Sequence, residues 1–89
     1  GHAERLTVPF DAVRTDKPVP YVQIADNGRV VHHSVQIGAR SQQGEQTLVA
    51  IEGAQGRALA EGALVLTGRV GALPEGTALR LPASVWWCL

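Results

Sequence analysis

Apolar and polar positions of this chain alternate over short segments, or the apolar residues gather in short runs, and both patterns favour β-strands. The clearest case is the segment at 21–38, which predicts two strands joined by a tight Asp26-Asn27-Gly28 turn. Ten glycines and five prolines interrupt the chain too often for long helices. Only residues 57–61 are compatible with a helical turn. The sequence therefore predicts an all-β fold.

The pattern predicts six or seven short strands. In chain order they cover residues 6–9 with a short continuation at 12–14, then 21–25, 29–37, 46–51, 63–67 and 77–81. A polar turn is expected at 41–44, and loops at 15–20, 52–62 and 68–76. Strands at this spacing, with glycine and proline between them, are typical of a small barrel or sandwich. We expect one barrel domain over 6–85, an N-terminal tail with the remnant of a cleaved tag over 1–5, and a C-terminal tail over 86–89.

The turn at Asn27-Gly28 decides which side chains of the hairpin share a face. A two-residue type I′ turn puts Asp26 opposite Arg29. One core-like face then carries Val22, Ile24, Val31, His33, Val35 and Ile37, and the other, solvent-like face carries Tyr21, Gln23, Ala25, Val30, His32, Ser34 and Gln36. A three-residue loop with Gly28 in a bulge would pair Ile24 with Val30 and invert the second strand. The alternation slightly favours the two-residue turn, and both registers stay open.

Composition limits the size of the core and the classes of partner. Eighty-nine residues support one domain with a modest core, and a hydrophobic content of 45% fits a globular chain. Eight Lys and Arg residues balance eight Asp and Glu residues, so the chain lacks the basic excess of a nucleic-acid-binding domain. Cys88 is the only cysteine, which excludes an intrachain disulfide and a Cys-rich zinc site.

No segment has the pattern of an active site. The carboxylates lie in or beside predicted turns and loops, where solvation accounts for them. No serine has the Gly-x-Ser-x-Gly context of a nucleophile elbow. Gly53-Ala54-Gln55-Gly56 lacks the Lys-Ser/Thr that completes a phosphate-binding loop. We therefore expect a protein that is not an enzyme and that holds no cofactor.

His32 and His33 are the candidates for metal chemistry. As neighbours in a strand they point to opposite faces, so the pair does not chelate one metal ion without a bulge. A surface His32 and a half-buried His33 account for both. Two functional alternatives stay open: a small ligand- or metal-binding β-barrel that uses His32 or His33, and a histidine that senses pH.

Trp86 and Trp87 form an unusual apolar patch near the C-terminal end of the chain. In one interpretation one indole caps the barrel and the other is partly exposed. In a second, both belong to a protein-docking hot spot. In a third, the indoles contact the headgroup level of a membrane.

Several strand-and-turn motifs resemble a known family. The first half carries Val8-Pro9, Ala12-Val13, Tyr21-Val22, Asp26-Asn27-Gly28-Arg29-Val30 and Val35-x-x-Gly38. The second half carries Leu59-Ala60-Glu61-Gly62-Ala63-Leu64-Val65, similar to the family's Gly-Leu-x-x-Gly-x-x-Val-Val, and Leu73-Pro74-Glu75-Gly76, similar to its closing Leu-x-x-Gly. Together, over residues 6–81, they resemble the membrane-proximal domain of periplasmic adaptor subunits (membrane fusion proteins) of RND-type tripartite efflux pumps. Ala58 departs from a family glycine, and residues 52–57 look like an insertion.

The resemblance implies a fold, a location and partners. The fold would be a small permuted SH3-like barrel or roll, in the periplasm and peripheral to the inner membrane. The partners would be the inner-membrane RND transporter and other adaptor protomers, and the family has no catalytic residues. Candidate docking residues are Arg29, His32, Trp86 and Trp87. In that family the domain also uses strand material from the N-terminal end of the parent chain, so we expect an exposed sheet edge and an edge-strand homo-oligomer.

Overall fold

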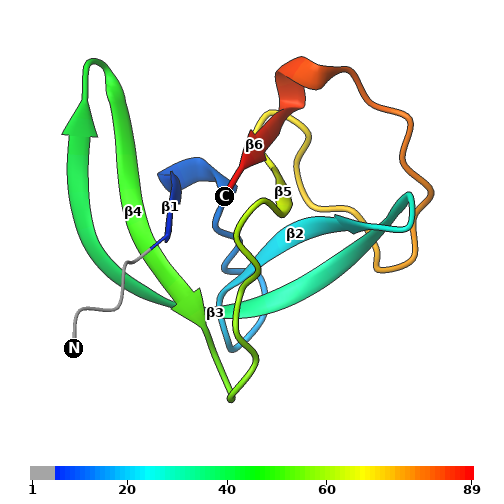
Figure 1. The fold of residues 1–89 in the computed structure, drawn as a ribbon, viewed down its shortest axis with the longest axis horizontal. Coiled ribbons are helices and arrows are strands. Elements are labelled where there is room, and N and C mark those ends of the chain that lie inside the picture. Colours follow the sequence, from blue (N-terminus) through cyan, green and yellow to red (C-terminus); the bar gives the residue numbers. More distant parts are fainter. Residues whose placement is uncertain (1–5) are drawn as a thin grey trace.

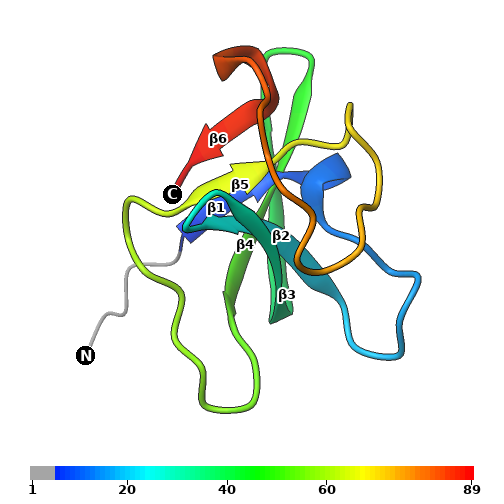
Figure 2. The same ribbon diagram turned by 90° about the vertical axis from the view of Figure 1, so that its right-hand side faces the viewer.

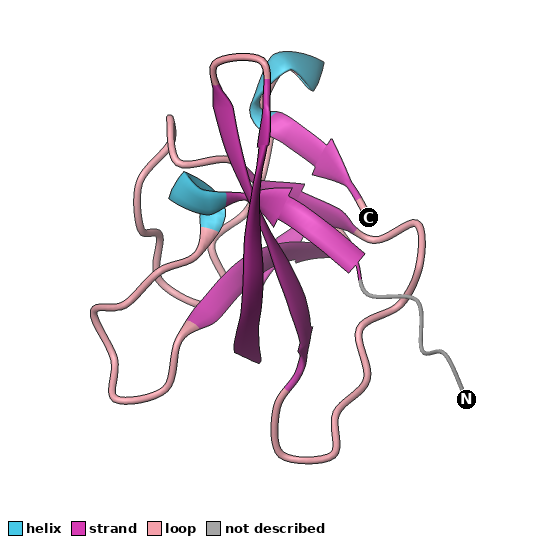
Figure 3. Cartoon of the chain, turned by 90° about the vertical axis from the view of Figure 1, so that its left-hand side faces the viewer, coloured by secondary structure: helices cyan, strands magenta, loops and turns pink. Residues whose placement is uncertain are grey.

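The computed structural model describes residues 6–89, and its strands form one antiparallel six-stranded sheet (Figure 1). The strands are β1 (Leu6–Pro9), β2 (Tyr21–Asp26), β3 (Arg29–Gln43), β4 (Gln46–Gly53), β5 (Leu64–Leu66) and β6 (Trp86–Cys88). Their order in the sheet is β1-β4-β3-β2-β5-β6. Within the described residues the helical pieces are two 3₁₀ turns, η1 (Phe10–Ala12) and η2 (Ala83–Val85), drawn in cyan in Figure 3. The prediction of an all-β, barrel-like fold is confirmed. The part of the chain that was expected to be an N-terminal tail, 1–5, lies outside the described residues.

The sheet curls until its two end strands meet. The indole Nε1 of Trp87 on β6 donates a hydrogen bond of 2.8 Å to the carbonyl oxygen of Thr7 on β1. Figure 2 shows β1, β5 and β6 on neighbouring parts of the curled sheet. Residues 86–89 were expected as a tail, and this is wrong, because β6 pairs with β5 and Leu89 packs on the core. The sequence pattern for this strand was weak, since a strand of three residues is stable only when it pairs with a neighbouring strand.

The β2–β3 hairpin has the two-residue turn that the alternation favoured. Asn27 and Gly28 have φ values of 50° and 74°, and Asp26 lies opposite Arg29. Both central residues of a type I′ turn need this left-handed conformation, which asparagine and glycine adopt at low cost. Val22 therefore lies opposite His33, as the first register requires.

The composition of the core confirms in part the predicted core-like face of the β2–β3 hairpin. The buried members of the core come from five strands and η1: Val8, Ala12, Val22, Val35, Val49, Ile51 and Val65. Ile37 was expected among them and is instead 41% exposed. The register between β3 and β4 shifts between Ile37 and Arg40, which marks a bulge. A bulge bends its strand and disrupts the ladder locally, and Ile37 is the last paired residue of β3 before this irregularity.

The face expected to meet solvent is largely covered. Tyr21, Gln23 and Val30 are each at most 2% exposed. The reason is the long connection after β5, which runs back along β3. The amide of Val30 donates to the carbonyl of Thr77, and the amide of Gly76 donates to the carbonyl of Val30. The strand expected at 77–81 is reduced to a single bridge between Arg29 and Ala78, but this segment still occupies the edge of β3.

The β3–β4 hairpin is longer than the sequence indicated. β3 continues to Gln43, and the turn is Gly44-Glu45 rather than the expected 41–44. The hairpin extends beyond the rest of the sheet (Figure 1). Among the described strands, none pairs with residues 37–43 on the side of β3 that faces away from β4. An exposed sheet edge is thus present, while its pairing with a second copy stays a prediction.

No helix within 6–89 is long and apolar enough to cross a membrane.

Candidate functional site

The four predicted docking residues lie on two different elements. Arg29 and His32 are on β3, where the connection after β5 covers the strand, and the Arg29 Nη1 donates to the carbonyl of Gly76 at 2.8 Å. Trp86 and Trp87 are on β6, and Trp87 packs against the core. Arg29 and Trp87 therefore make contacts that hold the fold, which is consistent with a structural role for each. A docking role for these four residues stays a prediction.

His32 lies in a junction of three segments. Its Nδ1 accepts a hydrogen bond of 2.6 Å from the Lys17 ammonium, and its Nε2 donates one of 2.7 Å to the carbonyl of Leu73. These partners require the neutral tautomer with the proton on Nε2, since an ammonium only donates and a carbonyl only accepts. The ring also lies against the ring of Tyr21, with centroids 4.4 Å apart. Both ring nitrogens of His32 are occupied by protein groups.

Tyr21 links the same junction to Asp16. Its hydroxyl donates to both carboxylate oxygens of Asp16, at 2.8 and 3.1 Å. This hydrogen bond is the main cause that lowers the pKa of Asp16 below its usual value of 3.8. Burial, followed by the same hydrogen bond, raises the pKa of Tyr21 above 10.0. Each effect favours the neutral phenol beside the charged carboxylate.

The raised pKa of Tyr21 predicts a loss of stability in alkali. A group whose folded-state pKa is raised stabilises the fold fully below its unfolded pKa, about 10, and loses that contribution as pH rises through the folded pKa. Unfolding by urea, followed by tryptophan fluorescence, should give a falling midpoint above about pH 10. Tyr21→Phe, which cannot ionise, should be less stable at pH 7 and should lack this alkaline step. An identical alkaline step in both proteins would contradict the assignment to Tyr21.

His33 lies on the opposite side of β3 from His32 and makes a different contact. Its Nε2 donates to the carbonyl of Arg57 at 2.9 Å. Within 6–89, no group of three or more His, Cys, Asp or Glu side chains comes together in a way that holds a metal ion. The geometry therefore gives no particular support to the alternative of a metal-binding barrel.

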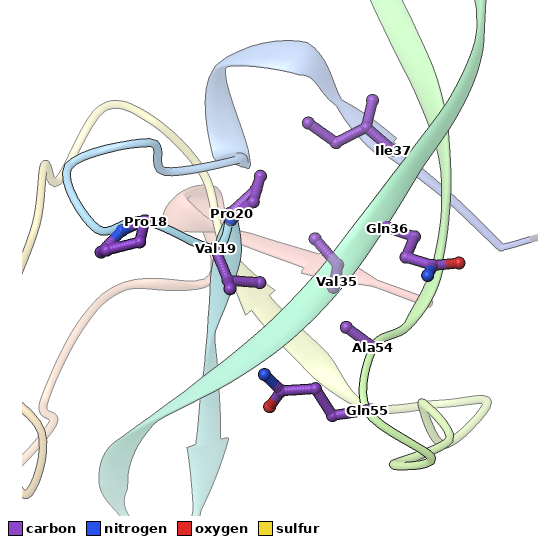
Figure 4. A pocket seen from close by; sticks show the side chains of 8 residues that line it. All are labelled: Pro18, Val19, Pro20, Val35, Gln36, Ile37, Ala54 and Gln55. Carbon is purple, nitrogen blue, oxygen red and sulfur yellow. The ribbon is translucent and has the colours of Figure 1, made fainter.

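An apolar groove, which the sequence did not indicate, opens beside this junction. It has a volume of about 440 Å³ and is lined by Pro18, Val19, Pro20, Val35, Gln36, Ile37, Ala54 and Gln55. Figure 4 shows the proline-flanked Val19 on one side, with Val35 and Ala54 across from it. Val19 is 36% and Ile37 41% exposed, so two large apolar side chains meet solvent at its rim. The available signal was a valine between two prolines in a predicted loop.

Two backbone hydrogen bonds hold the floor of the groove. The amide of Val35 donates to the carbonyl of Pro20, and the amide of Ala54 donates to the carbonyl of Ser34, both at 2.9 Å. Gln55 has a φ of 59°, a left-handed conformation that costs a non-glycine residue about 1 kcal/mol. Its side chain is exposed and its amide points toward Val19 in Figure 4. A strained polar residue at the rim of an apolar groove is typical of a binding site.

A second, smaller hollow of about 230 Å³ lies between η1 and the start of β4. It is lined by Pro9, Phe10, Asp11, Gln46 and Thr47. The Arg40 guanidinium lies 4.0 Å from the centroid of the Phe10 ring, so Phe10, although 38% exposed, already has a partner of its own chain. The larger groove is therefore the better candidate for a surface that receives another molecule.

Comparison with known proteins leaves the family open. No protein-family model, curated protein sequence or solved structure matches the chain. The groove and the junction beside it must therefore be interpreted from their own chemistry.

Proposed function

We propose that this chain is a non-enzymatic docking domain, the membrane-proximal domain of a periplasmic adaptor of an RND-type efflux pump. The observation that carries the docking role is the apolar groove between the loop at 15–20 and β3. An apolar surface that remains exposed in a domain of this size favours a partner, because its burial adds free energy to association. The identity of the partners rests on the motif resemblance: the inner-membrane transporter and neighbouring adaptor protomers.

The groove favours a protein partner that presents an extended backbone. Ile37, at its rim, begins the part of β3 whose outer side has no partner strand among the described residues. An extended segment at this edge would gain main-chain hydrogen bonds and insert an apolar side chain beside Val19. The exposed amide of Gln55 is available to a backbone group of the same segment. In this proposal, apolar contact in the groove supplies the affinity, and hydrogen bonds to the edge of β3 orient the partner.

Charged substitutions in the groove should weaken docking without unfolding the domain. Val19→Asp and Ile37→Asp place a carboxylate on the surface to be buried, which we expect to weaken binding by about tenfold or more. Because both positions are exposed, stability should change by only about 0.5 kcal/mol. Leu64→Asp is the matched control, since Leu64 on β5 is also 41% exposed but does not line the groove. Efflux of a pump substrate from cells, together with the melting temperature of each purified variant, measures the two effects.

A photo-crosslinking residue at position 19 identifies the partner in the same cells. We expect adducts with an inner-membrane transporter of the RND class or with a second adaptor copy, identified by mass spectrometry. The same residue at Gln43, in the tip of the β3–β4 hairpin, provides the comparison surface. The proposal fails if the groove variants match Leu64→Asp in efflux and the transporter adduct is absent at position 19.

A further inference from the structure

Lys17 connects one side of the groove to His32. It directly precedes the Pro18-Val19-Pro20 segment that lines the groove. Its ammonium donates to His32 Nδ1 at 2.6 Å and lies 4.7 Å from the centroid of the Tyr21 ring. Two prolines stiffen the segment, because each fixes its own φ and restricts the residue before it. The position of Val19 therefore depends on where Lys17 is held.

His32 is held more firmly on its other side. Its Nε2 donates to the carbonyl of Leu73, and its backbone amide donates to the Glu75 carboxylate at 3.0 Å. The segment that carries Leu73 is fixed in turn by Gln23, which is buried and bonds to both Gly71 and Leu73. If one contact of the imidazole must break, it is the exposed contact with Lys17.

Proton uptake by His32 breaks that contact. An imidazole gains its second proton in mildly acidic solution, and Nδ1 then becomes a donor that cannot accept from an ammonium. Two cations would also face each other at hydrogen-bond distance. The bond from Nε2 to the Leu73 carbonyl becomes stronger at the same time, because its donor is charged. Lys17 is therefore released while His32 keeps its place on β3.

Some of the groups around His32 favour a positive charge on its ring, and others oppose it. On the loop at 15–20, Lys17 opposes the imidazolium and Asp16 favours it. On β2, the Tyr21 ring attracts a cation on its face. Arg14, which precedes β2 and bridges to Tyr21, acts on Asp16 and Tyr21. On the segment after β5, the Glu75 carboxylate, bonded to the His32 amide, favours the imidazolium. The two carboxylates and the Tyr21 ring are thus the neighbours that attract an imidazolium, and Lys17 is the neighbour that an imidazolium repels.

We propose that His32 is a pH-dependent switch of the groove: when it is neutral it holds Lys17 and Val19 in place, and when it is protonated it releases them. The movement ends at Pro20, whose carbonyl stays bonded to the amide of Val35. The shape of the apolar groove then differs between neutral and mildly acidic solution. The consequence for partners rests on the proposed docking function, whereas the switch itself belongs to this chain alone.

Methyl NMR of the purified chain tests the switch without any partner. Between about pH 8 and pH 5 the Val19 methyl signals should shift in one step, with the midpoint of the His32 ring protons. The step should be lost in His32→Gln. It should persist in His33→Gln, the matched control, whose histidine bonds to Arg57 instead. Lys17→Met, an exposed position that leaves the fold intact, should fix the Val19 signals near their acidic position at every pH.

The outcomes separate this inference from the docking proposal. Val19 signals that do not titrate, or that follow His33, overturn the switch and leave the groove variants of the docking test unaffected. If Val19 titrates with His32 but Val19→Asp and Ile37→Asp do not affect efflux, the switch stands and the docking proposal fails. Should His32→Gln fail to fold, Lys17→Met alone decides, because a pH-dependent Val19 in that variant contradicts the mechanism.

Discussion

Replacing Gly53 with alanine is expected to remove about 3 kcal/mol or more of the free energy of unfolding. A Cβ at this last residue of β4 would lie 1.6 Å from the carbonyl oxygen of Arg57 and 2.6 Å from its carbonyl carbon. Both are backbone atoms, so no rotation of a side chain relieves the clash. The segment at 54–58 must move, and it carries the contact to His33 and the rim of the groove.

Thermal unfolding of Gly53→Ala measures this effect, and the melting temperature should fall by about 12 °C or more. Gly44→Ala is the matched control in the β3–β4 turn, where φ is 61° and a Cβ meets nothing within 4 Å. That variant tests the left-handed backbone alone and should cost about 1 kcal/mol. Equal losses in the two variants would show that the close approach of the Arg57 carbonyl is not what requires glycine.

The close approach also explains why the groove was not predictable. The turn at Asn27-Gly28 could be predicted from the sequence, because the two residues that need a positive φ are adjacent and form a known two-residue hairpin turn. At Gly53 the reason for glycine is a carbonyl four residues away, in a connection with no regular pattern. Gln55, which has a positive φ without being glycine, gave no signal in the sequence at all.

The burial of side chains on the β2–β3 hairpin was likewise predictable where it depends on local pairing and not where it depends on distant segments. Alternation correctly placed Val22 and Val35 in the core, since these positions depend only on the register of β2 and β3. It failed for Gln23 and Ile37. Gln23 is covered by a segment about fifty residues later, and Ile37 is exposed at the point where the register between β3 and β4 shifts. Neither the path of a long connection nor the site of a bulge follows from the period of a strand.

Little in the sequence indicated that β6 would close the barrel, although the contact that closes it has a clear physical basis. Trp87 was one of two adjacent tryptophans in an expected tail. In the fold, its indole fills the space beside the core and its N–H satisfies a carbonyl of the edge strand β1. An amphipathic indole is suited to this place, with its ring against the core and its donor at the edge. Trp86 and Trp87 are both half-buried, and Trp87 is the one that packs against the core.

Gln23 makes the buried polar contact on which the covered face depends. Its Nε2 donates to the carbonyl of Gly71 at 2.8 Å, and its Oε1 accepts from the amide of Leu73 at 2.7 Å. The side chain is 1% exposed. One amide thus satisfies a donor and an acceptor of the connection after β5, and no other side chain of similar size offers both in this geometry. The connection, and with it the Leu73 contact of His32, is positioned by this residue.

Gln23→Glu is therefore expected to destabilise the fold by about 3 kcal/mol at pH 7, where a buried carboxylate oxygen would face the Gly71 carbonyl. Burial and this facing oxygen raise the pKa of the introduced carboxyl above its unfolded value of about 4.3. A raised pKa means that the protonated form is favoured in the folded state, where its O–H donates to Gly71. The deficit relative to the unchanged protein should therefore be smallest below about pH 4 and should grow as the pH rises through the folded-state pKa.

Urea unfolding of both proteins at about pH 4 and pH 7 measures this difference. Gln43→Glu, at an exposed position on the β3–β4 hairpin, is the matched control and should show no deficit at either pH. A deficit of Gln23→Glu that is equal at the two pH values would mean that the lost amide donor, rather than the buried charge, sets the cost. A variant as stable as the unchanged protein at pH 7 would show that the connection after β5 does not close over β2. In that case the Leu73 contact, which keeps His32 on β3 when Lys17 is released, would also be absent.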